Sequence, residues 1–360
     1  MFSLKGLFTF ALLLVSVYAD CPNVKDSDIT PCVCLTNQIR CEGPSVTNDV
    51  LAKVLATIDK SRSDYQKEFD GLELYNTKVT KVTTEIFGKL VLKTFAKFNS
   101  NPISSVSLGN FPDLVYLDLV NNNLSKTVDS NLFLGLKSLR FVNLGGNDIE
   151  DFPRDTFAQS DNLQRIVLSG NKIKRLESDE FSSEYHNNIE LTEVDLSNNA
   201  LTLLPNNIFW PLRRPLSINL AHNKLATGLE VDALSFGEDA IQYEPIRLIL
   251  SDNGFKDENL LATTFAHIVR QKLSVALDLS DNGVTKLTDK VFQDLLRANR
   301  RTTVTLNGNP IKCADCANKW IPGDIAANKV RANQIQLTKC TDDAKRTLTQ
   351  YTAADYKDCK

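Results

Sequence analysis

Apolar residues recur along this chain in a fixed order that fits neither a helix nor a simple alternating strand. In the stretch LVYLDLVNNNL, leucines stand at positions 114, 117, 119 and 124, and an asparagine stands at 122. Aligning the chain on this asparagine recovers the same order at positions 77, 101, 122, 147, 171, 199, 223, 253, 282 and 309, with threonine at the first. Neighbouring copies lie 21 to 30 residues apart. The chain is therefore built from about ten repeated units.

A period of this length with this order predicts an α/β leucine-rich repeat solenoid. Each unit contributes a short strand whose alternating apolar residues, such as Leu117 and Leu119, point inward and stack on the neighbouring units. The asparagine then falls at a turn, where its amide can donate to and accept from buried backbone groups. We expect a curved parallel sheet with short helices or irregular segments on its convex side. The predicted ladder is Asn101, Asn122, Asn147, Asn171, Asn199, Asn223, Asn253, Asn282 and Asn309.

The later repeats are longer and carry helical patterns. The segment 288–301 places Val291, Leu295 and Leu296 on one face, and the segment 260–273 does the same with Leu261, Phe265, Ile268 and Val269. Packed helices need more room than paired strands, about 8–10 Å against about 4.8 Å. We therefore predict a flatter N-terminal half and a more curved C-terminal half.

All eight cysteines lie at the two ends of the chain. An even number in a secreted chain predicts disulfides, and four cysteines at each end leave three pairings open. The pair at 313 and 316 also has the spacing of a redox or zinc half-site. We expect no metal there, because the other two C-terminal cysteines stand too far apart to complete a zinc site. The set is Cys21, Cys32, Cys34, Cys41, Cys313, Cys316, Cys340 and Cys359.

The N-terminus has the layout of a signal peptide. One basic residue, Lys5, precedes an apolar run over 7–17, and Val17 and Ala19 precede the expected cleavage site. A signal anchor is the alternative. We predict a signal peptide over 1–19, an N-terminal cysteine cap over 20–60, repeats over 61–308 and a C-terminal cap over 309–360. The net charge of −3 favours neither nucleic acid nor an anionic membrane. The predicted protein is secreted and extracellular, without a membrane span.

Two stretches resemble a known family. CPNVKDSDITPCVCLTNQIRC is similar to the N-terminal cap of extracellular leucine-rich repeat proteins, and NGNPIKCADCANKWI is similar to their C-terminal cap. The usual C-terminal motif has one residue between its first two cysteines, and this chain has two, so the standard pairing is not fixed. The overall layout also resembles secreted arthropod proteins that include the non-catalytic leucine-rich subunit of the Oplophorus-type luciferase. That resemblance implies a binding or stabilising subunit.

The strand positions between the inward residues predict a contact surface. One such column reads Gly71, Phe95, Tyr116, Phe141, Arg165, Glu193, Ser217, Arg247, Ala276 and Thr303. Large apolar residues in register on a solvated face indicate a partner site. The predicted site is Tyr75, Phe95, Tyr116, Val120, Phe141 and Val167. Alternatively, these rings pack on each other or under a loop. Arg165 is expected to pair with Glu193. The polar set Asp195, Ser197, Asn219, Ser251, Asp278 and Ser280 is expected to be simply solvated.

No motif in the sequence carries catalytic chemistry. Metalloprotease, hydrolase, phosphate-loop and dinucleotide signatures are absent, and His186, His222 and His267 stand alone. We predict no enzyme and no cofactor. One glycosylation sequon begins at Asn123, with Leu124 pointing inward and Ser125 outward. The first functional hypothesis is a secreted protein that binds a protein partner through its concave face. The alternative is a non-catalytic accessory subunit of a secreted enzyme complex.

Overall fold

The computed structural model describes residues 24–63, 67–124, 128–129, 131–153, 156–157, 160–178, 180–181, 190–237, 240, 242–337 and 339–359. The predicted signal peptide over 1–19, Cys21, Ser125 and His186 lie outside these residues. The predicted boundaries of the caps and of the repeat region stay predictions.

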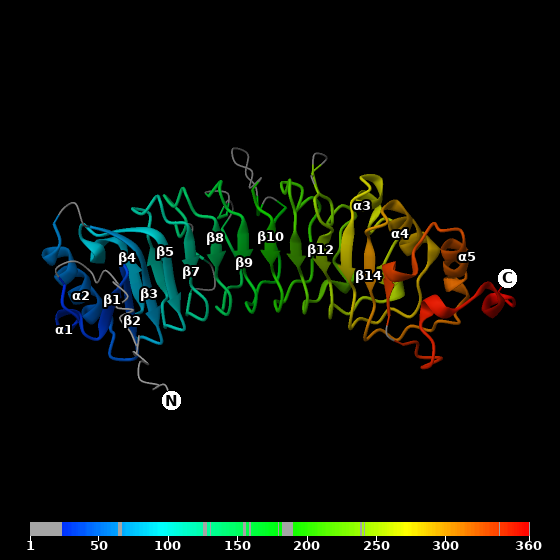
Figure 1. Ribbon diagram of the computed structural model, residues 1–360, viewed down its shortest axis with the longest axis horizontal. Coiled ribbons are helices and arrows are strands. Elements are labelled where there is room, and N and C mark those ends of the chain that lie inside the picture. Colours follow the sequence, from blue (N-terminus) through cyan, green and yellow to red (C-terminus); the bar gives the residue numbers. More distant parts are fainter. Residues whose placement is uncertain are drawn as a thin grey trace, which may run out of the picture.

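One long sheet runs through the molecule from end to end (Figure 1). Each strand pairs in parallel with the strand of the next repeat, and among the described strands only β1 and β2 pair antiparallel. Leu117 lies opposite Val142, which lies opposite Ile166, so equivalent residues of successive repeats meet as predicted. The strands, in sheet order, are β1 (Cys32–Leu35), β2 (Gln38–Glu42), β3 (Glu68–Tyr75), β5 (Val91–Asn99), β7 (Tyr116–Asp118), β8 (Phe141–Asn143), β9 (Arg165–Val167), β10 (Glu193–Asp195), β11 (Ser217–Asn219), β12 (Ile246–Ile249), β13 (Val275–Asp278), β14 (Thr303–Thr305) and β15 (Ile335–Gln336).

A second, two-stranded parallel sheet pairs β4 (Lys81–Thr83) with β6 (Ser105–Ser107). The long sheet, to which each repeat adds one parallel strand, confirms the predicted leucine-rich repeat solenoid.

The asparagines after the strands tie neighbouring repeats together. Asn147 Nδ2 donates to the carbonyl of Leu119 in the preceding repeat at 3.0 Å and to that of Leu144 at 2.9 Å. Its Oδ1 accepts from the backbone N–H of Leu124 at 3.3 Å. Asn122 donates in the same way, but its buried Oδ1 has no partner. The full pattern recurs at Asn171, Asn199, Asn223, Asn253, Asn282 and Asn309.

A row of buried phenylalanines fills the core between the sheet and the returning segments. Consecutive ring centroids lie 5.6 to 6.3 Å apart. Aromatic pairs at such distances add to the stability gained by burying their area. This row was not among the sequence predictions, although its members recur at the repeat period. They are Phe133, Phe157, Phe181, Phe209 and Phe236.

Helices lie at the two ends and in the later repeats (Figure 1). The α-helices are α1 (Asp26–Ile29), α2 (Asn48–Ser61), α3 (Ala266–Arg270), α4 (Asp294–Ala298) and α5 (Trp320–Ala326), and a π-helix, η5 (Asp289–Gln293), precedes α4. Short 3₁₀ turns are η2 (Thr84–Phe87), η3 (Leu225–Thr227), η4 (Asp257–Asn259), η6 (Cys316–Asn318), η7 (Ala332–Gln334), η8 (Leu348–Gln350) and η9 (Ala353–Tyr356). In α2, Thr47 Oγ1 caps the N-terminus by accepting from the N–H of Val50.

The two predicted outer helices have different outcomes. The helix expected in 288–301 is present as η5 and α4, and its predicted apolar face is buried. The helix expected in 260–273 is shorter, because α3 begins only at Ala266. The prediction was wrong for Leu261, which precedes the helix and is 59% exposed. The predicted difference in curvature between the two halves stays a prediction.

Disulfides close both ends of the solenoid. Cys32 pairs with Cys41 across the β1–β2 hairpin, and Cys34 is also disulfide-bonded. At the other end Cys313 pairs with Cys340, and Cys316 pairs with Cys359. Cys313 and Cys316 therefore do not pair with each other, as the two cysteines of a redox motif would. Their sulfurs are bonded in disulfides and are not thiolates that could bind zinc.

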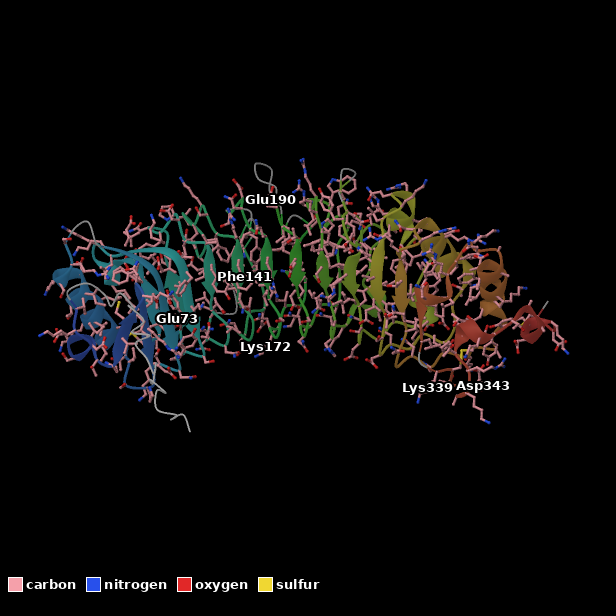
Figure 2. All side chains as sticks on the ribbon, viewed as in Figure 1. Glu73, Phe141, Lys172, Glu190, Lys339 and Asp343 are labelled. Atoms are coloured by element: carbon pink, nitrogen blue, oxygen red, sulfur yellow. A yellow bond between two sulfur atoms is a disulfide. The ribbon has the colours of Figure 1, made fainter. Side chains whose placement is uncertain are left out.

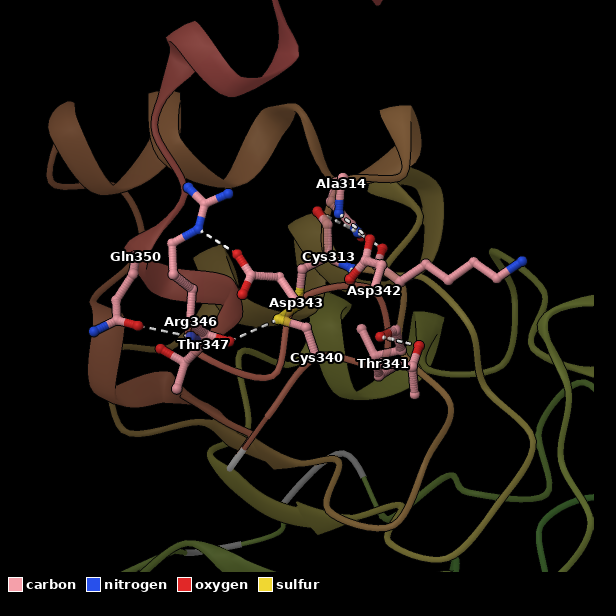
Figure 3. Close-up of a disulfide and its surroundings, with 12 residues drawn as sticks. Cys313, Ala314, Cys340, Thr341, Asp342, Asp343, Arg346, Thr347 and Gln350 are labelled. Carbon is pink, nitrogen blue, oxygen red and sulfur yellow. Dashed lines mark hydrogen bonds and ion pairs between the residues drawn. A yellow bond between two sulfur atoms is a disulfide. The ribbon is translucent and has the colours of Figure 1, made fainter.

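Beside the Cys313–Cys340 bond, the carboxylate of Asp342 accepts the backbone N–H groups of Cys313 and Ala314, each at 2.9 Å (Figure 3). Asp342 and the two sulfurs lie close together, but sulfurs bonded to each other do not serve as thiolate ligands. This carboxylate therefore braces the turn at the disulfide.

An ionic cluster in the C-terminal cap predicts loss of local structure in acid. Arg346 contacts Asp343 and Asp355, each at 2.8 Å, and its guanidinium lies over the ring of Tyr351. These contacts hold the pKa of Asp355 down to about 2, below its unfolded value of about 3.9. A depressed carboxyl pKa stabilises the fold above the unfolded pKa, and this contribution is lost as the pH falls through the folded pKa. We expect amide protection over residues 347–356 to decrease from about pH 4 to about pH 2.

Hydrogen exchange across that pH range, corrected for intrinsic rates, measures this effect. Arg346→Met is expected to lower the protection at neutral pH and to remove most of its acid dependence. An unchanged acid profile in this variant would show that the cluster does not control the cap.

Candidate protein-binding surface

The exposed positions of neighbouring strands form continuous rows across the sheet. Phe95 on β5 lies opposite Tyr116 on β7, which lies opposite Phe141 on β8, which lies opposite Arg165 on β9. Figure 2 shows Phe141 near the middle of the sheet and Glu73 on β3 toward its N-terminal end. The residues that the repeat alignment placed in one column therefore lie opposite one another on neighbouring strands.

We use "aromatic strip" for the six predicted residues, Tyr75, Phe95, Tyr116, Val120, Phe141 and Val167, all of which are half-buried. The rings of Tyr116 and Phe141 are stacked, with centroids 4.3 Å apart and planes 5° apart. The ring of Phe95 lies against Gly71, where an added Cβ would stand 2.2 Å from Cε2 of that ring. Tyr116 and Phe141 thus pack on each other while keeping part of their surface open.

Cationic side chains lie against the rings of the strip. Lys97 Nζ is 4.6 Å from the ring centroid of Phe95 and 5.9 Å from that of Tyr116. The guanidinium of Arg165 is 5.5 Å from the centroid of Phe141. These distances are within the range of cation–π attraction. The stacked pair is therefore bounded by Lys97 on one side and by Arg165 on the other. At the N-terminal end of the strip, Arg40 lies 5.2 Å from the ring of Tyr75.

Each of these cations also pairs with a carboxylate. Lys97 contacts Glu73 at 3.1 Å, and Arg165 contacts Glu193 at 3.2 Å, which confirms the predicted pair. The Lys97 side chain is 33% exposed and that of Glu73 only 14%. At this pair the positive group is therefore outermost. Lys97 was not among the residues predicted from the sequence, although it stands in the strand position next to the aromatic column.

Asp118 lies beneath the strip and orients Tyr116. Its Oδ1 accepts the backbone N–H of Val120 at 3.2 Å, and its Oδ2 accepts from the Tyr116 hydroxyl and from the Asn99 amide, each at 3.4 Å. Burial raises the pKa of Asp118. Burial, together with the nearby Asp118 charge, raises the pKa of Tyr116 to about 12. The phenol is protonated at neutral pH and serves as a hydrogen-bond donor.

The C-terminal strands carry a different kind of surface. The side-chain oxygens of Asp195, Asn219 and Asp278 accept the backbone N–H two residues further along, at 3.0, 3.2 and 2.9 Å. The expectation that this polar set is simply solvated was therefore wrong for Asp195, Asn219 and Asp278. They cap the strand ends, a role that short polar side chains take readily. Because these oxygens already accept hydrogen bonds from the backbone, they have less capacity to accept one from a partner.

The remaining candidate residues have ordinary surroundings. His222 pairs on the surface with Asp252 at 2.8 Å, and His267 Nε2 lies 3.0 Å from the carbonyl of Phe236. Asn123 is exposed and Leu124 is buried, as expected at the predicted sequon. Among the described residues, no helix is long and apolar enough to cross a membrane.

Comparison with known proteins places the chain among leucine-rich repeat sequences. No protein-family model matches the chain. Tsukushi of Gallus gallus is 34% identical over 117 residues, which are 32% of this chain and 31% of Tsukushi. Lumican of Gallus gallus is 34% identical over 143 residues, 39% of this chain and 40% of lumican. The transforming growth factor beta activator LRRC32 of Pongo abelii is 28% identical over 227 residues, 57% of this chain and 33% of that protein. The matches thus span only about a third to two fifths of these relatives' lengths.

Solved structures share the same architecture. A chain of the Drosophila Toll–Spatzle complex superposes with a TM-score of 0.51 at 26% identity, over 72% of this chain and 31% of that one. A chain of the octameric complex of Latrophilin 3, Unc5D and FLRT2 superposes with a TM-score of 0.65 over 91% of this chain and 99% of that one. Its identity of 18% supports likeness of fold alone. By its repeat register, its asparagine ladder and its stapled ends, this chain has the fold of the leucine-rich repeat proteins with disulfide-bonded caps.

Proposed function

We propose that this chain is a secreted binding protein that recognises a protein partner with the concave face of its sheet, at the aromatic strip. The observation that carries this proposal is the stacked pair of Tyr116 and Phe141, bounded by Lys97 and Arg165 on an exposed sheet face. Aromatic and arginine side chains supply most of the energy at protein–protein interfaces. They do so best when the surface is ordered before the partner arrives.

The strip is ordered in this way. Asp118 accepts from the Tyr116 hydroxyl at 3.4 Å, and Glu73 and Glu193 hold the two cations beside the rings. The side chains of the strip would therefore lose little conformational entropy when a partner binds. The apolar edges of the rings remain available for contact because every strip residue is only half-buried.

Two further observations support a secreted, partner-binding role. The disulfides at both ends need an oxidising compartment to persist, which agrees with the signal peptide predicted over 1–19. Two of the similar structures are complexes with other proteins, Toll with Spatzle and FLRT2 with Latrophilin 3 and Unc5D. Similar solenoids thus occur in complexes with protein partners.

Affinity capture of the tagged protein from its native secretion, with mass spectrometry and light scattering, tests this function. We expect a defined protein partner that the wild-type chain retains and the Phe141→Arg variant loses. A one-to-one companion with catalytic motifs would identify this chain as the accessory subunit of a secreted enzyme. Failure to retain any protein, or catalytic turnover by the purified chain alone, would contradict the proposal.

A further inference from the structure

The aromatic strip and the cations beside it present chemical groups in a fixed order, and a partner must match that order. Tyr116 on β7, Phe141 on β8 and Arg165 on β9 follow one another in one row of the sheet. Lys97 on β5 lies opposite Asp118, two residues along from that row, but its Nζ reaches back to the row, 4.6 Å from the ring centroid of Phe95. Two cations therefore stand on either side of an apolar ring stack. A complementary ligand has an apolar group between two anionic groups.

The exposure of the charged groups also favours carboxylates in the partner. Lys97 is more exposed than Glu73, and Arg165, at 52%, is more exposed than Glu193, at 38%. An approaching group therefore meets the cations first. A dense polyanion fits less well, because three cations in this region, Arg40, Lys97 and Arg165, face four carboxylates, Glu42, Glu73, Asp118 and Glu193. Two isolated carboxylates can contact the cations without facing that whole set.

The spacing of the strands sets the spacing of the two carboxylates. β5 and β9 are three strand intervals apart, which is about 14 Å at about 4.8 Å per interval. An extended peptide advances about 3.4 Å per residue, so four residues cover nearly the same distance. Residues i, i+2 and i+4 of an extended chain lie on one face. A peptide that crosses the strands would thus place i and i+4 over the cations and i+2 over the ring stack.

We propose that the segment recognised by the strip is an extended peptide with acidic residues at positions i and i+4 and an aromatic or aliphatic residue at i+2. This proposal rests on the proposed function and specifies the partner chemistry of the same surface. Arg247 provides the internal contrast. It occupies the same row on β12, but its neighbours are Ser217 and Ala276, so no ring stack adjoins it.

A synthetic nonapeptide, Gly-Ser-Glu-Ser-Tyr-Ser-Glu-Ser-Gly with blocked ends, tests the proposal by calorimetric titration of the purified full chain. We expect binding that weakens about fivefold in Lys97→Met and in Arg165→Met, and that is unchanged in Arg247→Met. Methionine keeps much of the apolar side chain, so each variant removes mainly the charge. A peptide of the same composition with its two glutamates adjacent is expected to bind more weakly, as is a peptide with lysines in place of glutamates.

Several results would overturn this inference. They are equal binding of the composition-matched peptide, an equal effect of Arg247→Met, no binding of the nonapeptide, or displacement of the nonapeptide by a heparin fragment that binds more tightly. The last result would assign the strip to a sulfated polysaccharide. If a captured partner is lost in Phe141→Arg but the nonapeptide does not bind, the proposed function stands and only this peptide pattern fails.

Discussion

Tyr116→Arg and Phe141→Arg are each expected to weaken partner binding by about 30-fold or more, which corresponds to about 2 kcal/mol. Each substitution removes one ring of the stacked pair and puts a third cation beside Lys97 and Arg165. The free energy of unfolding is expected to fall by only about 1 kcal/mol, the typical value of an aromatic pair. The half-buried positions of both rings support this small cost.

Surface plasmon resonance with the captured partner measures the first effect, and urea unfolding measures the second. Leu117→Ala, which truncates a fully buried side chain on the same strand as Tyr116, is the matched stability control. It is expected to cost about 3 kcal/mol. If the two arginine variants lose as much stability as Leu117→Ala, the rings belong to the core, and a role in recognition is contradicted.

Asn147→Ala is expected to lower the free energy of unfolding by about 2–4 kcal/mol. The side chain is 1% exposed and bonds the carbonyls of Leu119 and Leu144 and the N–H of Leu124. Alanine would leave the N–H of Leu124 without this partner, and a buried unpaired group costs about 1–3 kcal/mol. Each carbonyl would lose one of two amide donors, since Asn122 also donates to Leu119 and Asn171 also donates to Leu144. Urea unfolding followed by circular dichroism measures the change.

Asn122→Ala is the matched control in the preceding repeat. Asn122 is only half-buried, and its Oδ1 accepts no hydrogen bond, so fewer groups lose a partner on substitution. We expect it to cost about half as much as Asn147→Ala. Equal costs at the two sites would mean that the accepted hydrogen bond contributes nothing to the ladder.

The repeat register was predictable from sequence because every strand must present an apolar residue to the same core. An error of one residue would turn Leu117 outward and break the spacing to its ladder asparagine. The same constraint placed Tyr116 and Phe141 next to each other. The helix in 288–301 was predictable for a similar reason, since three apolar residues there share one helical face.

The positions of the cations beside the strip, Lys97 and Arg165, were harder to predict. Whether Lys97 lies over Phe95 depends on the rotamer of a long side chain, which no spacing in the sequence specifies. Sequence likewise left the C-terminal pairings open, because any of three arrangements satisfies four cysteines. The capping role of Asp195 was missed because it depends on the backbone direction at the strand end.

Photo-crosslinking tests the central claim, recognition of a protein through the aromatic strip, most directly. A benzoylphenylalanine residue placed at Val120, within the strip, is compared with one placed at Leu134, an exposed residue outside the sheet. Both variants are mixed with the native secretion, irradiated and analysed by mass spectrometry. We predict a specific protein adduct from position 120 and none from position 134. An adduct from position 134 with none from position 120 would contradict binding at the strip.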